Sequence, residues 1–124
     1  MSILDELSSR AGDRTEASNR DVAALCVENP VLLAEIARGL VHKDVALVGD
    51  AVEVFTLVAE QHPEQVISYA EQITPLLAHK TTRVRWEAAH TLALIAAQSP
   101  QTIATRLEPL AAIIRTDKSV IVRD

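Results

Sequence analysis

The sequence contains a copy of part of itself displaced by 37 residues. At this offset Pro63 falls on Pro100 (100 − 63 = 37), and the apolar positions nearby match as well. The matching pairs include Ile36 and Ile73, Leu40 and Leu77, Ala51 and Ala88, Phe55 and Leu92, Val58 and Ile95, Val66 and Ile103, and Leu77 and Ile114. A repeat of roughly 20 to 50 residues is typical of solenoids, whose units bury their apolar faces only by stacking on neighbours. The register therefore predicts an array of helical repeats.

The composition fits an all-α chain that forms a single domain. Hydrophobic residues make up 48% of the 124 residues, and most of them are aliphatic, with one Phe, one Tyr and one Trp. Small and aliphatic side chains suit close helix packing, and three Gly and five Pro leave little room for hairpins. A chain of this length buries a sizeable core if three or more repeat units stack.

The charge balance argues against nucleic acid and membranes as partners. Seventeen acidic and twelve basic residues give a formal net charge of −5, which opposes binding to phosphate backbones and anionic lipids. No run of 18 apolar residues and no basic leader followed by an apolar segment occurs. Cys26, the single cysteine, lies in an apolar stretch and is expected to be a small core residue. We therefore expect a soluble cytoplasmic protein.

Capping residues and prolines predict where the helices begin. Ser2 with Asp5 resembles a capping box that opens a short helix ending at Gly12. A second helix is expected over 15–28, and its predicted inner side consists of Ala17, Val22, Leu25 and Cys26. Three further helices are predicted to begin alike, with a proline at the first helical position, at Asn29-Pro30, His62-Pro63 and Ser99-Pro100.

The remaining helices are predicted to alternate with these as antiparallel partners. Asp44 is expected to cap a helix through about Gln61, and Thr81 or Thr82 one through about Gln98. Pro75 and Pro109 lie inside otherwise helical patterns and should bend the first helix of their pairs. The predicted organisation is one domain over 1–124. It consists of N-terminal capping helices (1–29) and repeat units 30–61, 62–98 and 99–124, the last incomplete.

Residues 82–92 resemble the second-helix signature of the HEAT-repeat (armadillo-like) family. The resemblance rests on the pair Val84-Arg85, followed by the small residues Ala88-Ala89 and then Leu92, and on the proline bend at Pro75. It covers roughly residues 30–124, although the middle unit has Leu47-Val48 instead of Val-Arg and Thr81 stands where an Asp is common. It implies a right-handed α-solenoid of about three antiparallel helix pairs, with first helices on the convex side and second helices on the concave side.

The second helices carry the candidate partner-binding residues. Spacings of 3, 4 and 7 place Arg83, Trp86, Glu87 and His90 on one side of a helix. Asp50 and Glu53 occupy the positions of Glu87 and His90 one unit earlier (87 − 50 = 37, 90 − 53 = 37). A Trp among an Arg and carboxylates is typical of a protein-binding patch.

Structural explanations exist for the same residues. Trp86 would instead pack against Gly49, which occupies its position one unit earlier. Arg83 and Glu87 would form an ordinary i,i+4 surface pair, and the acidic positions would be a solvated face. His42 and His79, each followed by Lys, are also 37 residues apart. We expect them to act as cations at helix C-termini rather than as metal ligands.

No catalytic motif is present, so we predict no catalytic residue, no cofactor and no metal site. The resemblance to HEAT proteins implies a non-enzymatic scaffold or adaptor that binds another protein. A regulatory subunit of an enzyme complex is the alternative, followed by a relative of HEAT-like DNA-repair glycosylases or bilin lyases. The incomplete last unit leaves apolar residues such as Ile103 and Leu107 without cover. We therefore predict possible homo-oligomerisation through the 100–124 edge.

Overall fold

The computed structural model describes residues 2–12 and 17–98, and all regular structure in these ranges is helical. The α-helices are α1 (Ser8–Ala11), α2 (Ala17–Glu28), α3 (Leu32–Arg38), α4 (Val45–Gln61), α5 (Ala70–Ile73) and α6 (Thr82–Gln98). The 3-10 helices are η1 (Ile3–Glu6), η2 (Gly39–Val41), η3 (Pro63–Gln65), η4 (Ile67–Tyr69) and η5 (Thr74–Ala78). The prediction of an all-α fold is confirmed for this part of the chain. None of the described helices is long and apolar enough to cross a membrane.

Residues 99–124 lie outside the described residues. The predicted helix start at Ser99-Pro100, the bend at Pro109 and the self-association edge therefore remain predictions.

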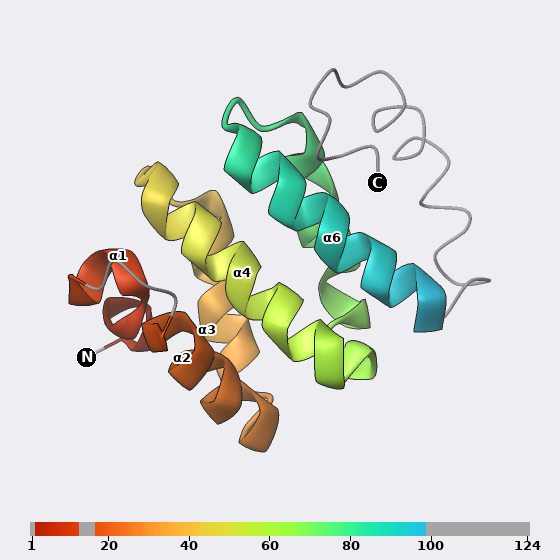
Figure 1. Ribbon diagram of the computed structural model, residues 1–124, viewed down its shortest axis with the longest axis horizontal. Coiled ribbons are helices and arrows are strands. Elements are labelled where there is room, and N and C mark those ends of the chain that lie inside the picture. The colour runs from red at the N-terminus through yellow and green to blue at the C-terminus, as the bar shows by residue number, and fades with distance from the viewer. Residues whose placement is uncertain (1, 13–16, 99–124) are drawn as a thin grey trace.

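Helices α2, α4 and α6 lie side by side, and α3 and the short helices between His62 and His79 lie behind them (Figure 1). The central helix α4 packs against both α2 and α6, and the short helix η5 packs on α6. Nearly every side chain from Leu47 to Ala59 is buried, including Phe55 at the middle of the helix. The core is therefore built around α4, which has α2 on one side, α6 on the other and the layer of α3 and the short helices behind it (Figure 1).

Helices α4 and α6 are equivalent elements of the repeated sequence. Each has 17 residues, and their starts and ends are 37 residues apart (82 − 45 and 98 − 61). The carboxylate of Asp44 accepts a hydrogen bond from the Ala46 N–H at 3.0 Å, as expected of an N-cap. The predicted starts and ends of both helices are confirmed.

His42 and His79 occupy the turns that precede these two helices. Nδ1 of His42 accepts a hydrogen bond from the N–H of Asp44, and Nδ1 of His79 accepts one from the N–H of Thr81, each at 3.0 Å. Each imidazole therefore binds a backbone amide of the turn that follows it, a contact that differs from the predicted one with the carbonyls of the preceding helix.

The segment before α6 is broken into short helices. Pro75 lies in the first turn of η5, directly after α5, and the hydroxyl of Thr74 donates a hydrogen bond to the Ala70 carbonyl at 2.7 Å. Proline lacks the N–H that would continue the α-helical ladder, and a threonine bonded in this way bends a helix further. At the predicted position the chain changes from α-helix to 3-10 helix.

The N-terminal segment agrees with its predicted boundaries but not with its predicted inner face. The Ser2 hydroxyl accepts from the Leu4 N–H, and Gly12 ends α1 with a φ of 75°, a conformation that favours glycine. In α2, however, Ala17 is exposed and Leu25 is 44% exposed. The buried residues of α2 are Asn19, Val22, Ala23 and Cys26. Their spacing follows the helical period, so the inner face of α2 includes a polar residue that the sequence interpretation left out.

The boundary of α3 also differs from the prediction. Helix α3 begins at Leu32 rather than at Pro30, because Asn29 and Pro30 form a turn in which the Asn29 carbonyl accepts from the Leu32 N–H at 3.0 Å.

The thiol of Cys26 is expected to be unreactive in the folded protein. Cys26 is fully buried, and burial, assisted by the negative charge of Glu35, raises its pKa to about 11. The reactive thiolate is therefore scarce at neutral pH. We expect Ellman's reagent to label Cys26 only after denaturation in urea. Labelling of the native protein at the rate of a free thiol would contradict this packing.

Candidate functional site

A buried polar network surrounds Asp50 at the junction of the N-terminal segment, α2, α4 and α6. The Asp50 carboxylate accepts hydrogen bonds from the Ser9 N–H (2.9 Å), from Nδ2 of Asn19 (3.0 Å) and from Nη2 of Arg83 (3.1 Å). Nδ2 of Asn19 also donates to Oε1 of Glu53 at 2.6 Å, and Oδ1 of Asn19 accepts from the Ser8 N–H at 2.9 Å. Asp50 is only 3% exposed. Its buried carboxylate therefore joins α4 to the N-terminal segment, to α2 and to α6.

The hydrogen bonds decide the charge of Asp50. Burial by itself raises the pKa of a carboxyl group, but donors from Ser9, Asn19 and Arg83 outweigh burial and lower the pKa of Asp50 below its ordinary value of 3.8. Asp50 is therefore a carboxylate at neutral pH, and its negative charge is balanced by groups of the same chain.

This arrangement corrects the interpretation of the acidic positions as a solvated face. Asp50 and Glu53 are both buried, whereas Glu87, one repeat later, is half-buried. The difference has a physical cause: the N-terminal segment and α2 cover Asp50 and Glu53 on one side of α4.

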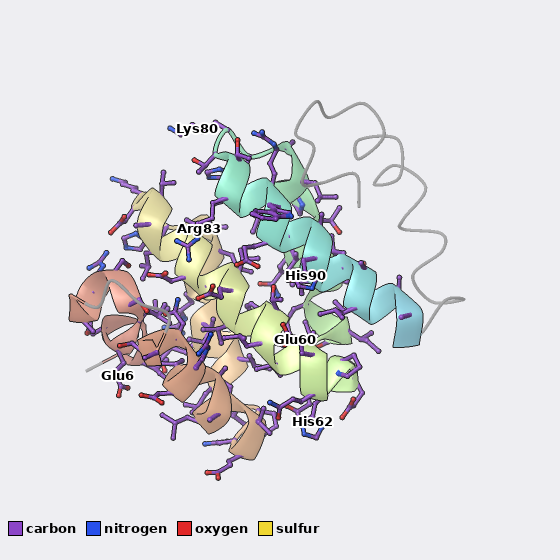
Figure 2. All side chains as sticks on the ribbon, in the orientation of Figure 1. Glu6, Glu60, His62, Lys80, Arg83 and His90 are labelled. Carbon is purple, nitrogen blue, oxygen red and sulfur yellow. The ribbon has the colours of Figure 1, made fainter. Side chains whose placement is uncertain are left out.

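Arg83 fills the space that was expected to receive Trp86. A Cβ atom on Gly49 would come within 2.7 Å of Nη1 of Arg83, so the missing side chain of Gly49 makes room for the guanidinium. From there the guanidinium of Arg83, which is labelled in Figure 2, binds the carboxylate of Asp50 on α4 at 3.1 Å. The prediction that Trp86 packs against Gly49 is therefore wrong.

Trp86 instead lies at an open groove between α4 and α6 and is 45% exposed. The groove has a volume of about 290 Å³. Its lining residues are Glu53, Thr56, Leu57 and Glu60 from α4 and Trp86, Glu87 and His90 from α6. We call this hollow the α4–α6 groove. The labelled side chains Glu60 and His90 can be followed in Figure 2, one on each of the two helices.

Two threonines join the helices beside the groove. The hydroxyls of Thr56 and Thr91 are hydrogen-bonded at 2.6 Å, and the Thr91 hydroxyl also donates to the Glu87 carbonyl at 2.8 Å. The Thr56 hydroxyl also lies 3.3 Å from Oε1 of Glu87, so the two hydroxyls fix the spacing of the helices close to this carboxylate. The groove thus lies between two long helices that are joined by a hydrogen bond between their side chains.

A second hollow of about 390 Å³ adjoins the first on the other side of α4. It lies between α2 and α4 and shares Leu57 and Glu60 with the α4–α6 groove. Its other lining residues are Arg20, Ala23, Ala24, Val27, Glu28 and Gln61. Leu57 and Glu60 therefore form a ridge that faces two neighbouring hollows.

The structure separates the six predicted partner-binding residues into two groups. Glu53, Trp86, Glu87 and His90 meet at the groove, whereas Asp50 and Arg83 bind each other in the polar network. Two further groove residues, Leu57 and Glu60, were not among the six predicted partner-binding residues. Both follow Glu53 at helical spacing (i+4 and i+7), so extending the same face of α4 by two turns would have found them.

Within residues 2–12 and 17–98 no group of three or more His, Cys, Asp or Glu side chains is placed to hold a metal ion. Comparison with known proteins adds no assignment: no family model, no curated protein and no solved structure matches this chain significantly.

Proposed function

We propose that this chain is a non-enzymatic protein-interaction module of the cytoplasm, built as a HEAT-like right-handed α-solenoid. The repeated sequence supports the architecture, as do two 17-residue helices set 37 residues apart and preceded by the same histidine turn. Its partner is another protein, bound at the α4–α6 groove.

The observation that carries this proposal is the exposure of Trp86 at the groove. Large aromatic side chains are mostly buried in folded proteins, and exposed ones are enriched where proteins bind each other. Trp86 shares the lining of the groove with the apolar side chain of Leu57 and with polar groups, Glu60, Glu87 and His90 among them. An aromatic anchor with a polar rim is the usual composition of a protein-binding site.

The groove argues against a DNA-repair role. Three of its seven lining residues are glutamates and none is Lys or Arg, so the groove repels a phosphate backbone.

Affinity capture from a native lysate tests the proposal. The bait is the wild-type protein, and the comparison is a Trp86→Ala, Glu87→Arg double variant shown by circular dichroism to be folded. Val41→Ala is the matched control, because Val41 is exposed and is not among the groove residues. We expect mass spectrometry to find a protein that wild type and control retain and the double variant loses. Identical capture by all three proteins would contradict a binding role for the groove.

A further inference from the structure

We infer that the edge of the molecule at which α4 and α6 begin binds an acidic segment of a partner protein. This edge carries five basic side chains, Arg10, Lys43, Lys80, Arg83 and Arg85, and we call it the basic edge. None of the five lines the α4–α6 groove, so the basic edge is a second surface, beyond the one in the proposed function.

The basic side chains gather because α4 and α6 lie side by side and begin at the same end of the molecule. Figure 2 shows Lys80 and Arg83 at this end, and Arg83 binds Asp50 in the second turn of α4 at 3.1 Å. Arg10 reaches the turn before α4, where its Nε lies 3.5 Å from the Asp44 carboxylate. The described residues contain seven lysines and arginines, so most of their positive charge lies at one edge of a chain whose net charge is −5.

The charges of Lys43 and Lys80 are available to another molecule. Both side chains are exposed, and neither forms an ion pair among the described residues. The two carboxylates of the edge are already bound by Arg10 and Arg83. Five basic groups and two acidic ones leave the edge with an excess of three positive charges, which attracts a segment of opposite charge.

The turns that carry the two lysines are braced in the same way. Nδ1 of His42 and Nδ1 of His79 each accept a hydrogen bond at 3.0 Å from the backbone N–H two residues further on. Arg85 adds to the second turn, because its Nη1 donates to the His79 carbonyl at 2.8 Å and its Nη2 to the Thr82 hydroxyl at 3.1 Å. Turns that are ordered before binding lose less conformational freedom when a partner binds.

Helix stabilisation does not explain this placement of charge. Acidic side chains stabilise the start of a helix and basic ones its end, but neither α4 nor α6 has an acidic residue in its first turn or a basic residue in its last. Instead, Arg83 and Arg85 lie in the first turn of α6, and Glu60 lies in the last turn of α4. Departures from such local rules are expected at functional sites.

An acidic protein segment fits this edge better than a nucleic acid does. The basic groups cover only the starts of two helices, and the remainder of the chain carries the excess of negative charge. A nucleic acid has a phosphate at every nucleotide and extends past so short an edge, where this negative charge repels it. Packed helix axes lie roughly 8 to 10 Å apart, and residues three apart in an extended peptide are about 10 Å apart. Two carboxylates at that separation therefore fit Lys43 and Lys80, which precede the two helices at equivalent positions.

A titration of the full, isotope-labelled chain followed by NMR tests the inference. The ligands are a short synthetic peptide of Gly with Glu at every third position, the same peptide with the neutral isostere Gln, and a single-stranded thymidine oligonucleotide. With the Glu peptide we expect saturable shifts of the backbone amides in the turns before α4 and α6, with weaker affinity at high salt, and no saturable shifts with the Gln peptide. Equal shifts with both peptides, or tighter binding of the oligonucleotide than of the Glu peptide, would overturn the inference.

Matched variants locate the effect, with affinities measured by isothermal titration calorimetry. We expect Lys43→Gln and Lys80→Gln each to weaken the Glu peptide roughly two- to fivefold, and the double variant to weaken it about tenfold or more. Arg20→Gln changes the net charge as either single variant does, but Arg20 lines a hollow with Glu60 and Gln61 at the opposite end of α4 and should leave the affinity unchanged. An equal loss with Arg20→Gln and Lys80→Gln would mean attraction to net charge and would overturn the inference.

The same variants separate binding from folding. Lys43 and Lys80 lie beside the positive ends of two long helices, so removing their charges should leave the Tm unchanged or raise it while the affinity falls. A Tm that falls together with the affinity would mean that the lysines support the fold, and this too would overturn the inference.

Discussion

Phe55→Ala is expected to lower the free energy of unfolding by about 3 to 5 kcal/mol. Phe55 is fully buried at the middle of α4, and its ring packs against that of Tyr69 with 5.1 Å between the centroids. The substitution removes this contact and leaves a cavity in a helix that is covered from both sides, where neighbouring helices cannot close in without losing their own contacts. Urea denaturation followed by circular dichroism measures the loss.

The matched control for this substitution is Val41→Ala. Val41 is 87% exposed, so truncating it should change the free energy of unfolding by less than about 0.5 kcal/mol. If Phe55→Ala costs no more than Val41→Ala, α4 is not the centre of the core.

Asp50→Ala is expected to cost roughly 3 kcal/mol at neutral pH. The substitution removes the acceptor of the Ser9 N–H and one of the two acceptors of the buried Asn19 Nδ2, which keeps its hydrogen bond to Glu53. It also releases Arg83, whose side chain is 43% exposed and regains water. Most of the cost therefore comes from the two amide donors rather than from the ion pair. Asp21→Ala is the control, because Asp21 is exposed on the neighbouring helix α2.

The contribution of Asp50 is also expected to depend on pH. Its pKa in the folded protein lies below the ordinary value of 3.8, so the ionised form is favoured by folding. The resulting stability is fully present above about pH 4 and is lost as the pH falls through the folded-state pKa. The difference in unfolding free energy between wild type and Asp50→Ala should be constant from about pH 5 to 7 and shrink below about pH 4. A difference that grows on acidification would contradict this network.

Local signals in the sequence predicted the two long helices α4 and α6 well. A cap such as Asp44 acts on an amide two residues away, and a proline such as Pro75 acts on its own turn, so both are visible in a short window of sequence. The start and end of α4 and α6 followed from these signals together with the repeat register.

The candidate site was predicted less well because equivalent positions in two repeats do not face each other. Positions 37 apart are equivalent, but the contacts across α4 and α6 join residues at smaller separations. Asp50 meets Arg83 (83 − 50 = 33), Thr56 meets Thr91 (91 − 56 = 35) and the carboxylate of Glu87 lies near Thr56 (87 − 56 = 31). Gly49 likewise meets Arg83 (83 − 49 = 34) rather than Trp86. The contacts between the two helices therefore lie two to six residues away from the repeat register, which the repeat alone does not reveal.

The burial of Asp50 had no signal in its own repeat. It depends on Ser9, 41 residues away, and on Asn19, 31 residues away, neither of which belongs to the repeated register. A carboxylate on a helix surface is ordinarily solvated, so only the tertiary fold of the N-terminal segment makes this one internal.

The connections of Asp50 also bear on cooperativity. In stacked helical arrays, stability is close to a sum over neighbouring units, and an end unit can fray without disturbing the next but one. Here a single carboxylate on α4 accepts hydrogen bonds from the N-terminal segment on one side and from α6 on the other. Opening at either edge deprives the same buried charge of a donor and weakens its hold on the opposite edge. This part of the chain is thereby tied into one cooperative unit, and unfolding of its first helices also weakens the hydrogen bond that joins α4 to α6 on the opposite side.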